Sequence, residues 1–470
     1  MPKPEADEEP KDRNMTDSAA SPAPAPAPTP DPTAVIKSRS YLALLVLGAA
    51  LGVPVATVAY FFLEGVARLQ TEIFTDLPKQ VGFQGEPLWW PLPWLALSGV
   101  LVALAIRYLP GTGGHEPSEG FKSAGPVPPV ELFGIVAAAF ATLSLGVVLG
   151  PEAPLIAIGS GMGVLAVHLV KRDAPPMAAV VIGAAGSFAA IATLLGSPLV
   201  GAFLLMEMAG LGGPMMEIVL VPGLLAAGVG SLIFVGLNSL TGFGAFSLTV
   251  SSIPHVGSPN GIEFVWAIAI GVGAAVVATG IFKLATMLRP VVERSRVLVT
   301  PMAGLAVAGL ATAFAAGTGR SSSEVLFSGQ SALPSLVQQA SGWTVGALLL
   351  LMVCKGLAYA ISLSSFRGGP IFPGMFIGAA GGIALSHIGG LPMIAGAAMG
   401  VGAMIAGALK MPMTAVLLPS LLFLSDAVTL MPLVIVAVVV SYVVAIWIKP
   451  SPSAADALAQ APSPAPATSG

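Results

Sequence analysis

Residues 145–163 read Leu-Gly-Val-Val-Leu-Gly-Pro-Glu-Ala-Pro-Leu-Ile-Ala-Ile-Gly-Ser-Gly-Met-Gly. Their one charged side chain, Glu152, lies in an apolar run that is otherwise uncharged from Leu132 to His168. An ionisable group at membrane depth is costly, and such groups usually mark an ion or proton path. The Gly150-Pro151 pair before it is typical of a helix start, where free N–H groups and a partial positive charge suit an anion. The stretch therefore predicts an anion site with an acidic group at its mouth.

The composition is that of a membrane protein. Charged residues make up 9% of the 470, apolar residues make up 55%, and the mean hydropathy is +0.89, whereas about a quarter of the residues in a soluble domain are charged. A chain of this length has room for many spanning helices of about 20 residues each, which predicts an all-α, multi-pass protein of the cell membrane. The net charge of −3, without a basic run, excludes nucleic acid as an expected partner and leaves membrane lipids.

No residue pattern indicates an enzyme or a resident cofactor. The four histidines show no metal-ligand spacing, and the single cysteine, Cys354, excludes an intrachain disulfide. A membrane-embedded hydrolase that used Glu152 as an acid or base would also need a nucleophile or a metal pair, and the sequence shows no arrangement of that kind. We therefore expect no enzyme and no cofactor, and the site at Glu152 predicts a small anion as the substrate.

The chain divides into a membrane domain at 39–448 and two tails. Residues 1–38 and 449–470 are rich in proline and alanine, cannot bury a core and are predicted to be disordered. Lys37 and Lys449 flank the first and last apolar segments, which predicts that both termini are cytoplasmic. Many apolar segments are shorter than a full span and abut at proline or glycine, as helices do that end inside a membrane. The expected segments are 41–63, 93–109, 130–148, 151–170, 177–194, 198–210, 216–236, 261–285, 298–317, 343–364, 372–388, 393–409, 412–425 and 431–448.

The sequence contains an internal repeat. Gly150-Pro-Glu-Ala-Pro-Leu-Ile-Ala-Ile-Gly-Ser-Gly-Met-Gly163 aligns without a gap with Gly369-Pro-Ile-Phe-Pro-Gly-Met-Phe-Ile-Gly-Ala-Ala-Gly-Gly382. The chain is therefore predicted to consist of two related halves, roughly 40–240 and 260–448. A second pair of similar segments, in the same order, is Ser197–Glu207 and Met411–Leu421.

Interrupted helices in duplicated halves predict a binding site between the halves, near the membrane midplane. Pro151 and Pro370 suit a first helical turn, where the missing N–H costs nothing. The free N–H groups beyond them select an anion over sodium or potassium, which would need carbonyl or carboxylate oxygens. The residues of these stretches expected at the anion are Gly150, Pro151, Glu152, Ala153, Ile371 and Phe372.

These motifs resemble those of the CLC family of chloride channels and chloride/proton antiporters. Gly146-Val-Val-Leu-Gly-Pro-Glu-Ala-Pro154 resembles the family's GxxxG-(K/R)-E-G-P signature, and Gly369-Pro-Ile-Phe-Pro373 resembles its second-half G-x-F-x-P element. The resemblance implies a CLC-type fold of two inverted-topology repeats with many short, tilted or re-entrant helices. It also implies a homodimer with a separate anion pathway in each subunit. Glu152 would then be the gating glutamate, which blocks the pathway when ionised and moves aside when protonated or displaced by an anion.

The sequence departs from the family pattern in several places. Pro151 and Ala153 stand where the family has a basic residue and a glycine. The first-half G-S-G-I-P element, whose serine hydroxyl faces the central anion, is altered to Gly111-Thr-Gly-Gly-His-Glu-Pro117. A literal match assigns the hydroxyl to Thr112, which we prefer, whereas counting back from Glu119-Gly120 puts Gly113 there. The family's pore tyrosine near the C-terminus has no match.

Whether transport is coupled to protons stays open. Coupled members carry an internal glutamate that relays protons, and alignment on Pro198 puts Met208 at that position, with Glu207 one residue earlier. Methionine carries no proton, which favours channel-like, voltage- or pH-gated conduction. A one-residue slip makes Glu207 a possible proton relay and the protein a chloride/proton antiporter. The alternative for Glu207 is a structural carboxylate, hydrogen-bonded across the dimer or to a helix end.

Two cations near the second repeat element have alternative interpretations. Lys355 and Arg367 flank an apolar helix and either attract anions or extend to the membrane interface. Arg367, close to Gly369, is the better candidate for a charge in a vestibule. A secondary transporter of another, organic anion would predict a wider site lined with arginine. The choice among chloride, fluoride and nitrate is left open.

Overall fold

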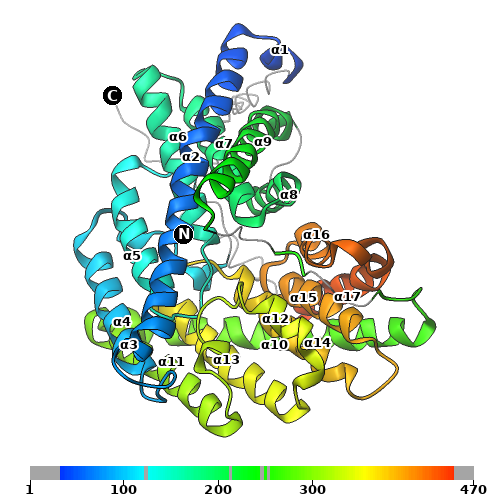
Figure 1. The fold of residues 1–470 in the computed structure, drawn as a ribbon. Helices are drawn as coiled ribbons and strands as arrows, with labels where there is room; N and C mark the ends of the chain where they lie inside the picture. Colours follow the sequence, from blue (N-terminus) through cyan, green and yellow to red (C-terminus); the bar gives the residue numbers. More distant parts are fainter. Residues whose placement is uncertain (1–31, 121–124, 211–213, 244–247, 251–254, 449–470) are drawn as a thin grey trace, which may run out of the picture.

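The computed structural model describes residues 32–120, 125–210, 214–243, 248–250 and 255–448, and its regular structure there is helical (Figure 1). Within these ranges, nine helices are long and apolar enough to cross a membrane. Shorter apolar helices lie between them, among them Pro198–Ala209, Ile371–Ser386 and Pro412–Leu422. The prediction of an all-α polytopic protein with many short helices is confirmed.

The helices of the first half are α1 (Pro32–Ile36), α2 (Arg39–Thr71), α3 (Leu77–Gln80), α4 (Pro91–Tyr108), α5 (Leu132–Ser144), α6 (Glu152–Val170), α7 (Pro176–Leu195), α8 (Pro198–Ala209) and α9 (Pro214–Thr241). Those of the second half are α10 (Gly261–Arg294), α11 (Arg296–Thr318), α12 (Leu333–Gln338), α13 (Val345–Ser365), α14 (Ile371–Ser386), α15 (Met393–Leu409), α16 (Pro412–Leu422) and α17 (Ala427–Ile448). The short helical turns are η1 (Glu72–Asp76), η2 (Pro110–Gly113), η3 (Pro117–Glu119), η4 (Pro129–Glu131), η5 (Ser322–Glu324), η6 (Ala340–Gly342) and η7 (Leu424–Asp426).

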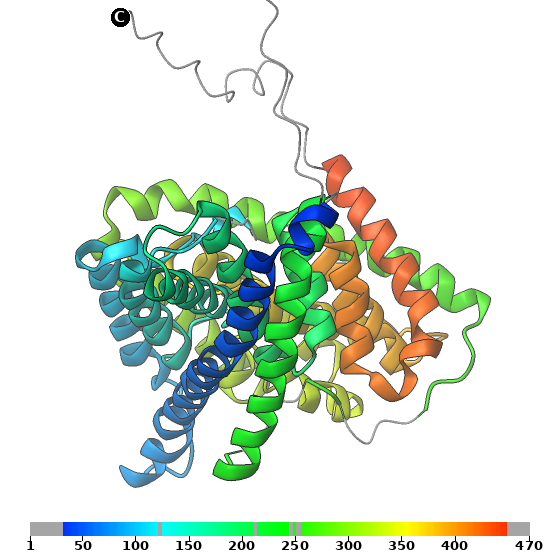
Figure 2. The same cartoon turned by 90° about the horizontal axis from the view of Figure 1, so that it is seen from above.

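The two halves pack in the same pattern. In the first, α7 packs against α6 and α9, with α2 alongside α9; in the second, α15 packs against α14 and α17, with α10 alongside α17 (Figures 1 and 2). Where the halves meet, α8 contacts its repeat counterpart α16. A contact between equivalent elements of a duplicated chain is what a local two-fold axis produces, as in inverted-topology repeats.

Glycines let the paired helices of each half approach closely. A Cβ added to Gly159 of α6 would overlap the carbonyl of Gly186 of α7. In the second half, Gly378 and Gly382 of α14 face the carbonyls of Gly400 and Gly396 of α15 in the same way. Small residues at such crossings bring backbones together, which is the main source of helix association where lipid replaces water. These glycines therefore fix the positions of α6 and α14, the helices that start at the repeated Gly-Pro pairs.

The ends of several elements differ from the sequence-based expectation. The predicted N-terminal tail, 1–38, overlaps helix α1, whose Val35 and Ile36 pack against a small apolar cluster around Tyr41. Residues 1–31 and 449–470 lie outside the described part of the chain. Helix α10 runs past the predicted end at 285 to Arg294, since Arg289 and Glu293 form a hydrogen-bonded ion pair one turn apart.

We expect Gly382→Ala to destabilise the protein by about 1–3 kcal/mol, because the added methyl group pushes α14 away from α15. Gly309→Ala in α11 is the matched control, because a Cβ there meets nothing within 4 Å. The control should leave the protein as stable as before or raise its stability by roughly 0.5–1 kcal/mol. Thermal unfolding of the two purified variants in detergent compares them, and equal midpoints would contradict the close-approach role of Gly382.

Candidate anion site

The site is built on a backbone pairing between the two repeat elements. The N–H of Gly150 donates to the carbonyl of Gly369 at 2.7 Å, and the N–H of Gly369 donates to the carbonyl of Gly150 at 2.5 Å. A Cβ on either glycine would overlap the Glu152 side chain, so a side chain at either position would displace its carboxylate. Immediately after the pair, Pro151 precedes α6 and Pro370 precedes α14. The antiparallel pairing of aligned residues brings two helix N-termini together from opposite halves of the chain.

Glu152 lies where these two N-termini meet. Its side chain is fully buried, and Oε1 accepts a hydrogen bond from the N–H of Phe372 at 2.9 Å. The N–H of Ile371 and the N–H of Glu152 itself also interact with the carboxylate. Oε2 has no hydrogen-bond partner within the described ranges. The carboxylate therefore occupies a position built for negative charge, and another anion can take those N–H groups only if the side chain leaves.

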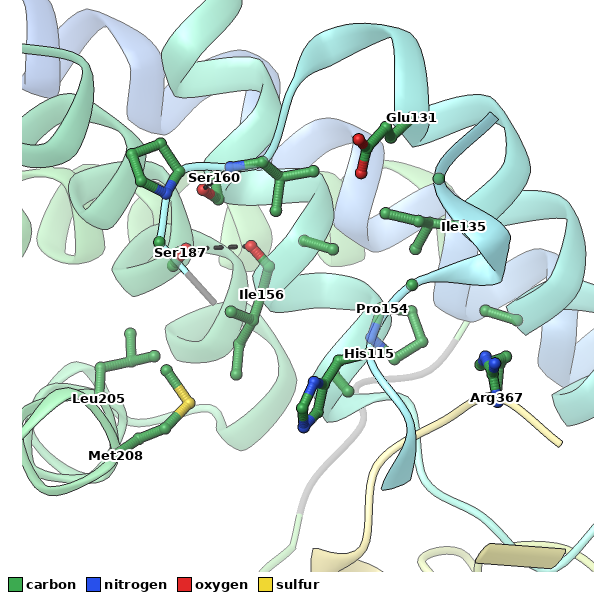
Figure 3. Close-up of a pocket in the computed structure, with 18 of the residues that line it drawn as sticks. His115, Glu131, Ile135, Pro154, Ile156, Ser160, Ser187, Leu205, Met208 and Arg367 are labelled. Carbon is green, nitrogen blue, oxygen red and sulfur yellow. Dashed lines mark hydrogen bonds between the residues drawn. The ribbon is translucent and has the colours of Figure 1, made fainter. Parts of the chain in front are cut away.

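A cavity of about 450 Å³ leads towards this position (Figure 3). Its walls include the 111–115 turn, the first turn of α6 at Ala153 and Pro154, and the arm from Arg367 to Pro370. Ala153 and Pro370 are the chain neighbours of Glu152 and Ile371, so the cavity reaches the residues next to the buried carboxylate. It is large enough to hold several water molecules as well as a hydrated anion.

Thr112 and Gly113 both line this cavity. Thr112 is exposed and has φ 49°, a conformation that is strained for a β-branched residue. The Nε of Arg367 donates to its carbonyl at 3.4 Å. Gly113 is buried, and a Cβ there would press on Ile106. The choice between the two residues as the anion's neighbour is therefore still a prediction.

Arg367 ties the cavity wall to an ion-pair cluster. Its side chain is 4% exposed and its Nη2 lies 3.0 Å from Oε1 of Glu116, so the expectation that it extends to the membrane interface is wrong. Glu116 also pairs with Arg296 at 2.9 Å and Arg289 at 2.7 Å. Burial raises the pKa of the Glu116 carboxyl, but these three guanidinium groups outweigh it and hold the pKa below its usual value. Arginines from three second-half segments thus hold one carboxylate of the first half.

Helix α13 carries three polar side chains on one face, those of Lys355, Tyr359 and Ser362, which are spaced as i, i+4 and i+7. The ammonium of Lys355, fully buried, donates to the carbonyls of Glu324, Val325 and Leu326, each at 3.0 Å. Its expected extension to the interface is therefore wrong as well. The spacing was visible in the sequence, but these carbonyls lie on a distant loop that no local pattern predicts.

The other two polar residues of that face bind the two chain segments, or arms, that lead into α6 and α14. The hydroxyl of Tyr359 donates to the carbonyl of Pro370 at 2.7 Å, and the Oγ of Ser362 accepts from the N–H of Val148 at 3.3 Å. Pro370 precedes α14, and Val148 lies on the segment that leads to Glu152. Sequence analysis missed both residues, because hydroxyl groups within an apolar helix are common and give no signal of their own.

Glu207 lies at the end of α8 and binds the start of α16. Its carboxylate accepts from the N–H groups of Met413 and Thr414, both at 2.7 Å, and from the hydroxyl of Thr414 at 2.6 Å. This is the helix-end alternative considered for Glu207. Met208, the next residue, lines the cavity instead (Figure 3).

The family model described as voltage gated chloride channel matches residues 29–216 and 99–446. The chain belongs to this CLC family. A relative from Salmonella choleraesuis, named "Putative ion-transport protein YfeO", is 30% identical over 364 residues, which are 76% of this chain and 84% of the relative. The protein of the same name from Escherichia fergusonii is 26% identical over 363 residues, or 76% of this chain and 82% of the relative.

Solved structures show the CLC fold in this chain. A slow cyanobacterial Cl⁻/H⁺ antiporter superposes with a TM-score of 0.69 at 20% identity, covering 87% of this chain and 95% of the other. A CLC-type fluoride/proton antiporter gives a TM-score of 0.64 at 19% identity over 86% and 95%. The predicted family and fold are confirmed. The protein is a multi-pass membrane protein of an anion-transporting family and is not an enzyme.

We expect Glu207→Ala to lower stability by roughly 0.5–2 kcal/mol, because the first turn of α16 loses a side-chain cap. The control is Glu217→Ala, which removes an exposed carboxylate from α9. Thermal unfolding in detergent measures both, and a midpoint for Glu207→Ala equal to that of the control would mean that the cap contributes nothing.

Proposed function

We propose that the protein conducts chloride or a similar small anion between the starts of α6 and α14, with Glu152 as the gate. The hydrogen bond from the Phe372 N–H to the buried Glu152 carboxylate carries this proposal. An ionised carboxylate competes with the anion for the same N–H groups, while a protonated one has lost the charge that holds it there. The residues proposed around the anion are Thr112 or Gly113, Gly150, Pro151, Ala153, Ile371 and Phe372.

Channel-like conduction is our first choice of mechanism. Met208, which lines the cavity, has no proton to transfer. Glu207 is held in place at α16 by three hydrogen bonds from Met413 and Thr414. A relay group has to gain and lose a proton in each cycle, and this role suits neither residue.

Proton-coupled anion exchange is the second candidate. The cavity reaches Ala153 and Pro154, so water inside it can bring a proton close to Glu152 without a relay residue. The similar solved structures named above are of antiporters. Under this alternative Glu152 is both gate and proton carrier, and Glu207 is either a relay or purely structural.

We further propose a homodimer in the cell membrane with a separate pathway in each subunit, as the family resemblance implies. The basic residues Arg289 and Arg296 support a cytoplasmic position for the Glu116 cluster and the cavity beside it. The tendency of basic residues to lie on the cytoplasmic side of a membrane also supports cytoplasmic termini.

Removing the gate should remove the pH dependence of transport. Chloride efflux from proteoliposomes carrying the unmodified protein should rise as the pH falls, by up to about tenfold per pH unit where Glu152 titrates. Glu152→Ala should give efflux that is high and independent of pH. Glu263→Ala, which removes another buried carboxylate, is the control. A Glu152→Ala protein with unchanged pH dependence would exclude Glu152 as the gate.

Proton coupling is measured in the same vesicles with a pH electrode in the bath. Passive conduction predicts that a chloride gradient moves no protons against their own gradient. Proton uptake in a fixed ratio to chloride would sink the channel-like mechanism and favour exchange. In that case Glu207→Gln separates the two routes, because its proton flux should be lost with a relay and kept with direct protonation through the cavity.

A further inference from the structure

Tyr359 is a buried residue to which the proposed gating mechanism gives no role. It lies in mid-α13, its side chain is fully buried, and its ring packs edge-on against Phe282 with centroids 6.2 Å apart. A buried tyrosine hydroxyl needs a hydrogen-bond partner. Here that partner is the carbonyl of Pro370, the residue just before α14, at 2.7 Å.

The carbonyl of Pro370 and the N–H of Ile371 belong to one peptide group. This group is planar, and no cis peptide bond occurs in the part of the chain that the structure describes. In a trans peptide the C=O and N–H point in opposite directions. A donor on the carbonyl side therefore fixes the direction of the N–H on the other side, and the Ile371 N–H interacts with the Glu152 carboxylate. The hydroxyl also polarises the peptide, which makes its N–H a stronger donor.

The first half achieves the same orientation by different means. There the peptide that carries the Glu152 N–H has its carbonyl on Pro151, and that carbonyl accepts the N–H of Leu155 at 3.1 Å, as in an ordinary helix. In the second half Pro370 receives a side-chain hydroxyl from a neighbouring helix. The two N-termini at the site are thus alike in backbone direction and differ in what holds their first peptide.

We propose that Tyr359 is a positioning residue of the anion site, which orients and polarises the Pro370–Ile371 peptide so that its N–H binds the transported anion or, in its place, the Glu152 carboxylate. Tyr359 does not itself touch the anion. This inference rests on the proposed function, because it assumes that the anion and Glu152 use the same N–H groups.

Direct binding tests the proposal where Glu152 no longer competes. In a Glu152→Ala background, isothermal titration of the purified protein with chloride gives the affinity of the open site. Adding Tyr359→Phe removes one oxygen atom, leaves the ring in place and should weaken chloride binding about 3- to 10-fold, the usual range for one hydrogen bond. Tyr60→Phe is the matched control, since Tyr60 is equally buried but bonds Thr241 instead. It should leave the affinity unchanged.

The pH profile gives a readout that a packing role would not move. With Glu152 present, the Tyr359 hydroxyl helps to stabilise the ionised carboxylate through the Ile371 N–H. Tyr359→Phe should therefore let Glu152 take up a proton more readily and shift the pH of half-maximal chloride efflux upward by about half a unit to one unit. Tyr60→Phe should not shift it.

A variant with a stronger hydrogen-bond donor at position 359 tests the positioning role through a gain in chloride affinity, which a loss of folding cannot produce. 3-Fluorotyrosine at position 359 retains the hydroxyl and is the better hydrogen-bond donor, so chloride should bind more tightly and the pH of half-maximal efflux should fall. Equal chloride affinity in Glu152→Ala with and without Tyr359→Phe would overturn the positioning role alone. Absence of chloride binding in Glu152→Ala itself would overturn the proposed anion site and this inference with it.

Discussion

The pair of backbone hydrogen bonds between Gly150 and Gly369 is the constraint on which the site depends. It joins the two halves at aligned positions, and a side chain on either residue would displace the Glu152 carboxylate. Because a proline follows each glycine, the next free N–H groups are those at the starts of α6 and α14. Two partial positive charges then meet at one point, and a single carboxylate, Glu152, balances them.

The symmetry of the backbone contrasts with the asymmetry of the side chains that support it. The second half holds its arm through α13, where Lys355 fixes a distant loop and Tyr359 binds the residue before α14. Helix α5, which precedes the equivalent arm of the first half, contains no charged residue. Arg367 likewise belongs to the second arm only. The two arms are therefore alike in backbone and unlike in charge.

Buried polar residues were the hardest to interpret from sequence. Lys355 and Arg367 were candidates for the membrane interface, yet both are buried, because backbone carbonyls and Glu116 satisfy their charges. Glu207 was considered as a relay, and its carboxylate binds the N-terminus of a helix from the other half. In each case the partner is remote in sequence, so neither hydropathy nor spacing contains the information.

The membrane class, the positions of the long apolar helices, the repeat and the acidic group at its first element could be predicted from the sequence. These follow from hydropathy, Gly-Pro helix starts and two motifs that align without a gap, all of which are local properties of the chain, and the family resemblance added the expected gating role of Glu152. The pairing of Gly150 with Gly369, the hydrogen bond from Phe372 to Glu152 and the bond from Tyr359 to the Pro370 carbonyl emerged from the folded structure alone. Those contacts require two halves to meet, and a pattern along one chain states which groups need partners without stating where the partners lie.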